Sequence, residues 1–141
     1  MEKENTICIA MKRLQKEQKI IAEKDMEFQF IQNVPNPDTI PIMLFGNQNS
    51  QKPFSAFCID DVGCFKTNFF RLEKLDEEKG CATLSLLEAV DMDGCPVEDC
   101  DEIYSLLKTK CCVTVDLRCL CIINPLSPDL VNRPLPIIEP K

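Results

Sequence analysis

The sequence predicts a mainly β protein, with an antiparallel β-sandwich or barrel-like core and one N-terminal α-helix. Several short segments alternate apolar and polar residues with the period of a β-strand, and short polar turns separate them. A helical apolar period occurs near the N-terminus, and the last residues are rich in proline. We therefore expect three parts: a helical arm at 1–25, a β-rich core domain at 26–124 and a proline-rich tail at 125–141.

The helix is expected over about residues 6–24, where Asn5 or Thr6 can cap its first turn. Apolar side chains at spacings of four, three and seven residues form one narrow stripe: Ile7, Met11, Leu14 and Ile21. Mostly polar and charged residues occupy the other face. The stripe is compatible with two arrangements, a helix that packs on its own domain and an arm that packs on a neighbouring subunit.

Six segments have the composition and alternation of strands: 28–34, 40–46, 54–60, 68–75, 81–90 and 111–123. The polar run that ends in Gly80 is expected to join the fourth and fifth strands as a hairpin. The residues between the acidic loop and the last strand are ambiguous, and we assign them a short helical turn. The last 18 residues hold five prolines, which lack the amide donor of a central strand, so we expect an extended tail on the domain surface.

The composition excludes several classes of partner. The chain has 141 residues and a net charge of -7, which disfavours nucleic acid because phosphate neutralisation needs a basic surface. No apolar run is long enough to span a membrane, and the N-terminus lacks the apolar region of a secretory signal. A chain of this length can build a core without cross-links, so its ten cysteines are surplus to folding.

Four of these cysteines fall in the last predicted strand. Alternation places Cys111, Cys119 and Cys121 on its apolar, inward face and Cys112 on the other. By strand rise, the Cα atoms of Cys119 and Cys121 are about 6.8 Å apart, at the limit for a disulfide. No pair within this strand is well placed to close on itself. Any partner must come from another strand or another molecule.

Metal binding and catalysis have little support in the sequence. The chain contains no histidine and no C-x-x-C motif, so no catalytic, cofactor-binding or metal-ligating residue is assigned. Zinc held by cysteines from several loops remains a minority interpretation. The acidic loop at 91–102 lacks the ligand spacing of a calcium loop and is expected to be a solvated turn.

From Asp38 to Arg133, blocks of the sequence resemble the cysteine-rich spore coat and exosporium proteins of endospore-forming bacteria, the CotY/CotZ/ExsY group. The blocks, in order, are "DTIP" at 38–41, "CF" at 64–65, "FFRLEKL" at 69–75, "CATLSLL" at 81–87 and "CCVTVDLRCLCIINPLSPDLVNR" at 111–133. The matching thiols are Cys64, Cys81, Cys112, Cys119 and Cys121. The chain departs from the group at 76–80, where family members often carry a cysteine cluster.

The resemblance implies a structural protein that assembles with itself into a disulfide-stabilised, two-dimensional lattice of the spore coat or exosporium, through a closed homo-oligomer expected to be a hexamer. It also implies that the protein is synthesised in the mother-cell cytoplasm without a signal peptide. Other coat or exosporium proteins are the partners that it implies. The alternative is an adaptor that links other spore-surface proteins or appendages to these layers. A metal-binding or redox thiol protein is less favoured.

All ten cysteines are candidates for disulfides or cross-links: Cys8, Cys58, Cys64, Cys81, Cys95, Cys100, Cys111, Cys112, Cys119 and Cys121. Three of them lie in segments expected to protrude, and we expect these to join subunits: Cys8, Cys95 and Cys100. A local bridge or a free thiol remains the alternative for these three. On their strands, we expect Cys81 and Cys112 to be more exposed than Cys119 and Cys121.

Overall fold

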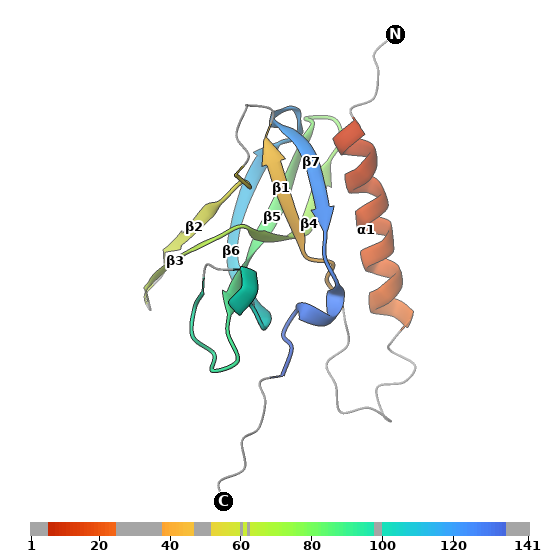
Figure 1. Ribbon diagram of the computed structural model, residues 1–141. Coiled ribbons are helices and arrows are strands. Elements are labelled where there is room, and N and C mark those ends of the chain that lie inside the picture. The colour runs from red at the N-terminus through yellow and green to blue at the C-terminus, as the bar shows by residue number, and fades with distance from the viewer. Residues whose placement is uncertain are drawn as a thin grey trace, which may run out of the picture.

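The structure, a computed structural model, describes residues 6–24, 38–46, 52–59, 61, 63–97 and 100–134. The described residues form one helix, seven strands and three short 3-10 turns, in the order α1 (Thr6–Lys24), β1 (Ile42–Gly46), β2 (Ala56–Ile59), β3 (Cys64–Thr67), β4 (Phe69–Asp76), β5 (Cys81–Val90), η2 (Cys100–Glu102), β6 (Ser105–Asp116), η3 (Leu117–Cys119), β7 (Leu120–Pro125) and η4 (Pro128–Leu130). The predicted mainly β fold with an N-terminal helix is confirmed (Figure 1).

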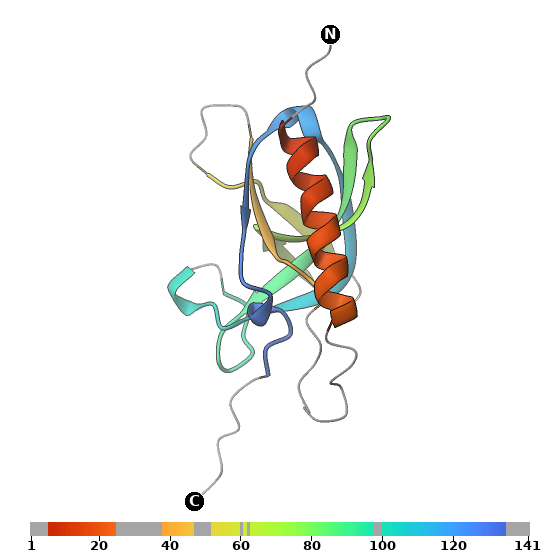
Figure 2. The same ribbon diagram turned by 90° about the vertical axis from the view of Figure 1, so that its right-hand side faces the viewer.

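Five strands form one antiparallel sheet in the order β6-β5-β4-β1-β7, and β2 pairs with β3 in a separate hairpin. The two edge strands of the large sheet, β6 and β7, are joined directly by the three-residue turn η3. So short a connection requires the two edges to approach each other at that end, and the sheet is therefore curled (Figures 1 and 2). Pro125 is tolerated at the end of β7 because this strand lies at the sheet edge.

The helix packs on its own sheet, alongside β4 and β7 (Figure 2). Ile7, Met11 and Leu14 are buried and share one apolar core with the inward side chains of the five strands. Of the two arrangements compatible with the apolar stripe, the structure therefore shows a helix that contributes to the core of its own domain.

A second apolar core lies on the opposite face of the sheet. Because side chains alternate along β5, Leu86 lies in the first core and Leu87 in the second. The pairing of β5 with β6 is irregular between Ser85 and Leu87. The second core is covered by side chains of the loop before β6 and of the segment after β7. Val131 forms a bridge with Leu106, so the described part of the proline-rich tail lies on the domain surface, as expected.

The structure corrects three predictions about the strands. The segment 111–123 is not one strand, because η3 divides it between β6 and β7. Residues 105–110, for which we expected a helical turn, begin β6, and the turn η2 lies before them. The strand β3 was not predicted. The strand expected at 28–34 lies outside the described residues.

Candidate functional site

The cysteines are the candidate functional groups, and the structure joins two of them. Cys58 on β2 and Cys111 on β6 form a disulfide, with Cα atoms 5.8 Å apart and a sequence separation of 53. Cys58 is buried in the first apolar core. The partner of Cys111 thus comes from another strand, one of the two sources that the sequence left open. This bond lies within one chain, so it does not bind a neighbouring molecule.

Seven cysteines are free thiols among the residues that the structure describes: Cys8, Cys64, Cys81, Cys95, Cys112, Cys119 and Cys121. Cys8 and Cys81 are half-buried, and the other five are exposed. Cys100 begins η2, and its side chain lies outside the described part. The protein therefore presents several thiols to its surroundings after the Cys58–Cys111 disulfide has formed.

The prediction that Cys119 and Cys121 face inward is wrong, because both are exposed. Their expected exposure relative to Cys81 and Cys112 is corrected with it: Cys112 is exposed, but Cys81 is half-buried. The prediction assumed an unbroken strand, in which alternate residues share a face. The turn η3 resets this alternation before either thiol is reached.

A local hydrogen bond explains the interruption. The Asp116 carboxylate accepts a hydrogen bond of 2.9 Å from the Arg118 amide and so caps η3. Residues three apart in a 3-10 helix lie on the same side. Leu117 and Leu120 are therefore both buried, while the thiol of Cys119 between them points outward. Cys121 lies at an irregularity in the pairing of β7 with β1, and it also faces solvent.

The free thiols lie at separate places on the molecule. The start of α1, the turn between β4 and β5, and η3 lie at one end (Figures 1 and 2). These elements carry Cys8, Cys81 and Cys119. The loop with Cys95 follows the far end of β5, whose 10 residues span about 30 Å. A subunit with thiols at both ends can be bonded to more than one neighbour.

The loop with Cys95 has a defined shape. The Asp91 carboxylate accepts hydrogen bonds of 2.9 Å from the amides of Asp93 and Cys95, and the Asp91 amide donates to the Cys95 carbonyl at 2.9 Å. Gly94 has a φ of 84°, which favours glycine. The carboxylate of Asp91 therefore stabilises the turn itself, as in other Asx turns.

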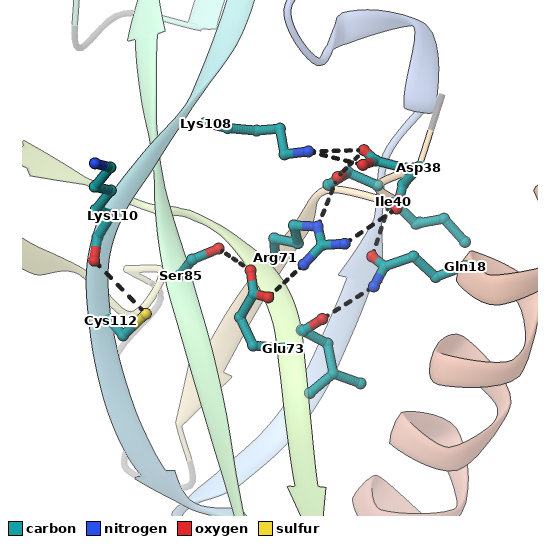
Figure 3. A network of polar contacts seen from close by, with 11 residues as sticks. Gln18, Asp38, Ile40, Arg71, Glu73, Ser85, Lys108, Lys110 and Cys112 are labelled. Carbon is teal, nitrogen blue, oxygen red and sulfur yellow. Dashed lines mark hydrogen bonds and ion pairs between the residues drawn. The ribbon is translucent and has the colours of Figure 1, made fainter. Parts of the chain in front are cut away.

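One buried polar side chain joins the helix to the sheet. The amide group of Gln18 donates a hydrogen bond of 2.9 Å to the Leu72 carbonyl and accepts one of 3.0 Å from the Ile40 amide (Figure 3). Gln18 is 7% exposed, so both bonds lie away from water. It occupies the gap in the apolar stripe between Leu14 and Ile21. These bonds fix the position of α1 along β4.

Arg71 on β4 is the centre of a neighbouring, half-buried network (Figure 3). Its Nε donates to the Thr39 hydroxyl at 2.7 Å, and its guanidinium is paired with Glu73. The Glu73 carboxylate also accepts a hydrogen bond of 2.7 Å from the Ser85 hydroxyl on β5. The network joins the segment before β1 to β4 and β5.

The carboxylates of this network are held in their charged form. Partial burial raises the pKa of Asp38, but hydrogen bonds from Lys108 and Thr39 and the charges of Lys108 and Arg71 outweigh it and lower this pKa. Lys108 on β6 lies 2.8 and 2.9 Å from the two carboxylate oxygens. At Glu73, burial likewise raises the pKa, and the bonded guanidinium of Arg71 contributes to the net lowering.

Comparison with known proteins agrees with the cysteine-rich surface. A family model described as spore coat protein Z matches residues 5–128. The spore coat protein Z of Bacillus subtilis (strain 168) is 40% identical over 105 residues, which cover 68% of each of the two chains. The chain belongs to the spore coat protein Z family. No solved structure is significantly similar to it.

The part of the chain that matches the spore coat protein Z family runs from α1 to η4 and includes all ten cysteines. It also includes the polar networks around Gln18 and Arg71, which sequence reasoning missed. The signal for Gln18 was a polar residue within an apolar stripe. The network around Arg71 has no comparable sequence signal, because its members are brought together by the pairing of strands.

Two further properties are established for the described residues of this family member. No group of three or more cysteine, aspartate and glutamate side chains lies close enough to hold a metal ion. The helix α1 is not long and apolar enough to cross a membrane.

Proposed function

We propose that this chain is a structural subunit of the spore coat or exosporium, which assembles with copies of itself and is then held by disulfides between chains. Family membership supports the spore coat as its place. The observation that supports cross-linking is that the described residues include five exposed free thiols on different elements, beside one internal disulfide. An internal scaffold of disulfides would instead have paired them.

The cross-links form by thiol–disulfide exchange with a low-molecular-weight disulfide as the oxidant. A thiolate attacks the oxidant and releases one reduced thiol, and a second protein thiolate attacks this mixed disulfide and releases the other. Two protein thiols thus lose two protons and two electrons, and one oxidant molecule is reduced. Exchange selects no partner until thiols are held close, so non-covalent contacts set the geometry.

The assembly is proposed to be a closed homo-oligomer, a hexamer, that extends into a two-dimensional lattice. Cys8, Cys95 and Cys100 remain candidates for bonds between subunits, and exposure adds Cys119 and Cys121. Deletion of the helical arm would not be a clean test of assembly, because α1 supplies part of the apolar core. Point substitutions on the outer face of α1 are the appropriate perturbation.

Electron microscopy of the purified protein, with and without reductant, tests this function. We expect rings or sheets, and a ladder of covalent species on a non-reducing gel that reductant removes. Replacing Cys8, Cys95, Cys100, Cys119 and Cys121 by serine should leave assemblies that dissociate on heating. In a matched control, Cys58→Ser/Cys111→Ser should retain the ladder. A protein that stays monomeric after oxidation would contradict the proposal.

One observation favours the adaptor alternative. Phe57 and Ile59 on β2 are 63% and 78% exposed, and Cys64, paired opposite Ile59, is exposed beside them. An exposed apolar hairpin with a thiol is suited to bind another coat protein. Mixed disulfides through Cys64 with a different coat protein, in place of a homotypic ladder, would favour this role.

A further inference from the structure

The helix α1 carries positive charge on a protein that is acidic as a whole. Five of the 16 basic residues of the chain lie within Thr6–Lys24, together with only two of its 23 acidic residues. Arg13, Lys16 and Lys19 are exposed. Their helical spacing places them away from the stripe that packs on the sheet. None of the ion pairs seen among the described residues involves these three side chains.

An open groove of about 910 Å³ lies between this basic face and β4. Three carboxylates also line it, and each already has a basic partner: Asp38 with Lys108, Glu73 with Arg71, and Glu77 with Lys12. The helical side of the groove therefore leaves an excess of positive charge. Ile9, which lines the groove, is 42% exposed and adds an apolar contact.

The acidic loop, residues 91–102, has the opposite character. It contains six acidic residues and no basic one. Asp93, Asp101 and Glu102 are exposed, and Met92 beside Asp93 is 58% exposed. The turn at its tip is already ordered by the carboxylate of Asp91, so binding would require little further ordering. The loop therefore offers an acidic surface with one apolar side chain.

The positions of the groove and the loop determine the kind of contact they can make. The helix α1, which forms one wall of the groove, and the turn η2 of the acidic loop lie on different sides of the molecule in both views (Figures 1 and 2). A contact between them therefore joins two copies through different surfaces. Such a head-to-tail contact repeats from subunit to subunit and produces a ring or an open array.

We propose that the groove between α1 and β4 binds the acidic loop of a second copy of this chain. This contact rests on the proposed self-assembly and names the surfaces that carry it. The basic side chains attract the loop and set its orientation, and an apolar contact of Met92 with Ile9 adds affinity. The loop of each subunit thereby occupies the groove of the next.

Charge reversal tests the contact under reducing conditions, where no disulfide can hold the subunits together. The groove variant is Arg13→Glu/Lys16→Glu and the loop variant is Asp93→Lys/Asp101→Lys. The groove variant places two carboxylates of α1 against the acidic loop, and the loop variant places two ammonium groups against the basic face of α1, so each alone should associate at least about tenfold more weakly than wild type. Sedimentation velocity over a range of protein concentrations measures this, and circular dichroism confirms that each variant is folded.

Mixing the two variants is the decisive step. At the substituted positions, the new carboxylates of the groove variant can pair with the new ammonium groups of the loop variant. The unchanged groove of the loop variant can in turn bind the unchanged acidic loop of the groove variant. An equimolar mixture should therefore regain assembly in which the variants alternate. Raising the salt from about 0.1 M to about 1 M shortens the Debye length from about 10 to about 3 Å and should weaken assembly of the wild type and of the mixture.

Matched controls reverse exposed charges outside both surfaces. Lys74→Glu/Lys79→Glu changes the net charge by as much as the groove variant does, and Asp61→Lys/Glu78→Lys by as much as the loop variant does. Both controls should assemble like wild type. This contact is overturned if the groove and loop variants assemble as well as the wild type, or if mixing them does not restore assembly. Either result would leave self-assembly itself intact. A wild type that stays monomeric would overturn both proposals.

Discussion

Loss of the Cys58–Cys111 disulfide should lower the free energy of unfolding by about 4 kcal/mol. The bond joins residues separated by 53 positions. In the chain-entropy description, closing a loop of this length removes about 14 cal/mol/K from the unfolded chain, which corresponds to about 4 kcal/mol at 25 °C. Domains are usually stable by only about 5–15 kcal/mol, so this is a large fraction of the total.

Urea unfolding with and without reductant measures this contribution. The chain has no tryptophan and one tyrosine, so far-UV circular dichroism is the suitable signal. Dilute protein keeps bonds between chains from contributing. The wild type should lose about 4 kcal/mol on reduction, and its thermal midpoint should fall by about 10 °C or more.

Two variants separate this bond from the other thiols. Cys58→Ala/Cys111→Ala should be destabilised without reductant and should show no further loss on reduction. Cys64→Ala/Cys112→Ala, which removes two exposed free thiols, should respond to reductant as the wild type does. If reductant leaves the wild-type midpoint unchanged, or shifts the first variant equally, the reasoning is refuted.

Two further predictions concern the polar networks. Gln18→Met should lower the free energy of unfolding by about 2–4 kcal/mol, because two buried backbone groups lose their partners, whereas Gln15→Met on the exposed face should cost less than about 0.5 kcal/mol. Equal losses in urea unfolding would contradict this role. The lowered pKa values of Asp38 and Glu73 stabilise the fold above their ordinary values of 3.8 and 4.5, and this stability is lost as the pH falls through the lower values of the folded state. In Asp38→Asn/Glu73→Gln, the thermal midpoint should therefore fall less steeply than in the wild type as the pH is lowered from about 6 to about 3. An equally steep fall in the variant would contradict the stabilising role of these carboxylates.

Local patterns predicted much of the fold. The helix α1 has the bounds expected from its cap and apolar stripe, and the predicted segments 40–46, 68–75 and 81–90 correspond to β1, β4 and β5. In these segments the alternation or helical period persists along the element, although β5 also buries Leu87 and Ala89 on its opposite face. Each pattern could therefore be recognised without knowledge of its neighbours in space.

The other parts of the fold depend on tertiary contacts, which the periodicity of apolar residues does not indicate. β3 is only four residues long, and its pairing with β2 defines it. The Cys58–Cys111 bond requires β2 to lie near β6, which follows from the tertiary arrangement. Residues 105–110 become strand because β5 is long enough to pair with them. Tertiary pairing thus decided where local propensity was ambiguous.

The turn η3 connects the curvature of the sheet to the proposed function. A continuous strand from Cys111 to Ile123 would have turned Cys119 and Cys121 into the core, where neither could meet another chain. The cap at Asp116 ends β6 and allows the chain to begin the opposite edge of the sheet within three residues. The same turn leaves both thiols exposed while keeping the intervening leucine buried. The approach of the two sheet edges and the exposure of the thiols therefore have one local cause. Thiols are exposed at this end of the molecule without the removal of apolar side chains from the core.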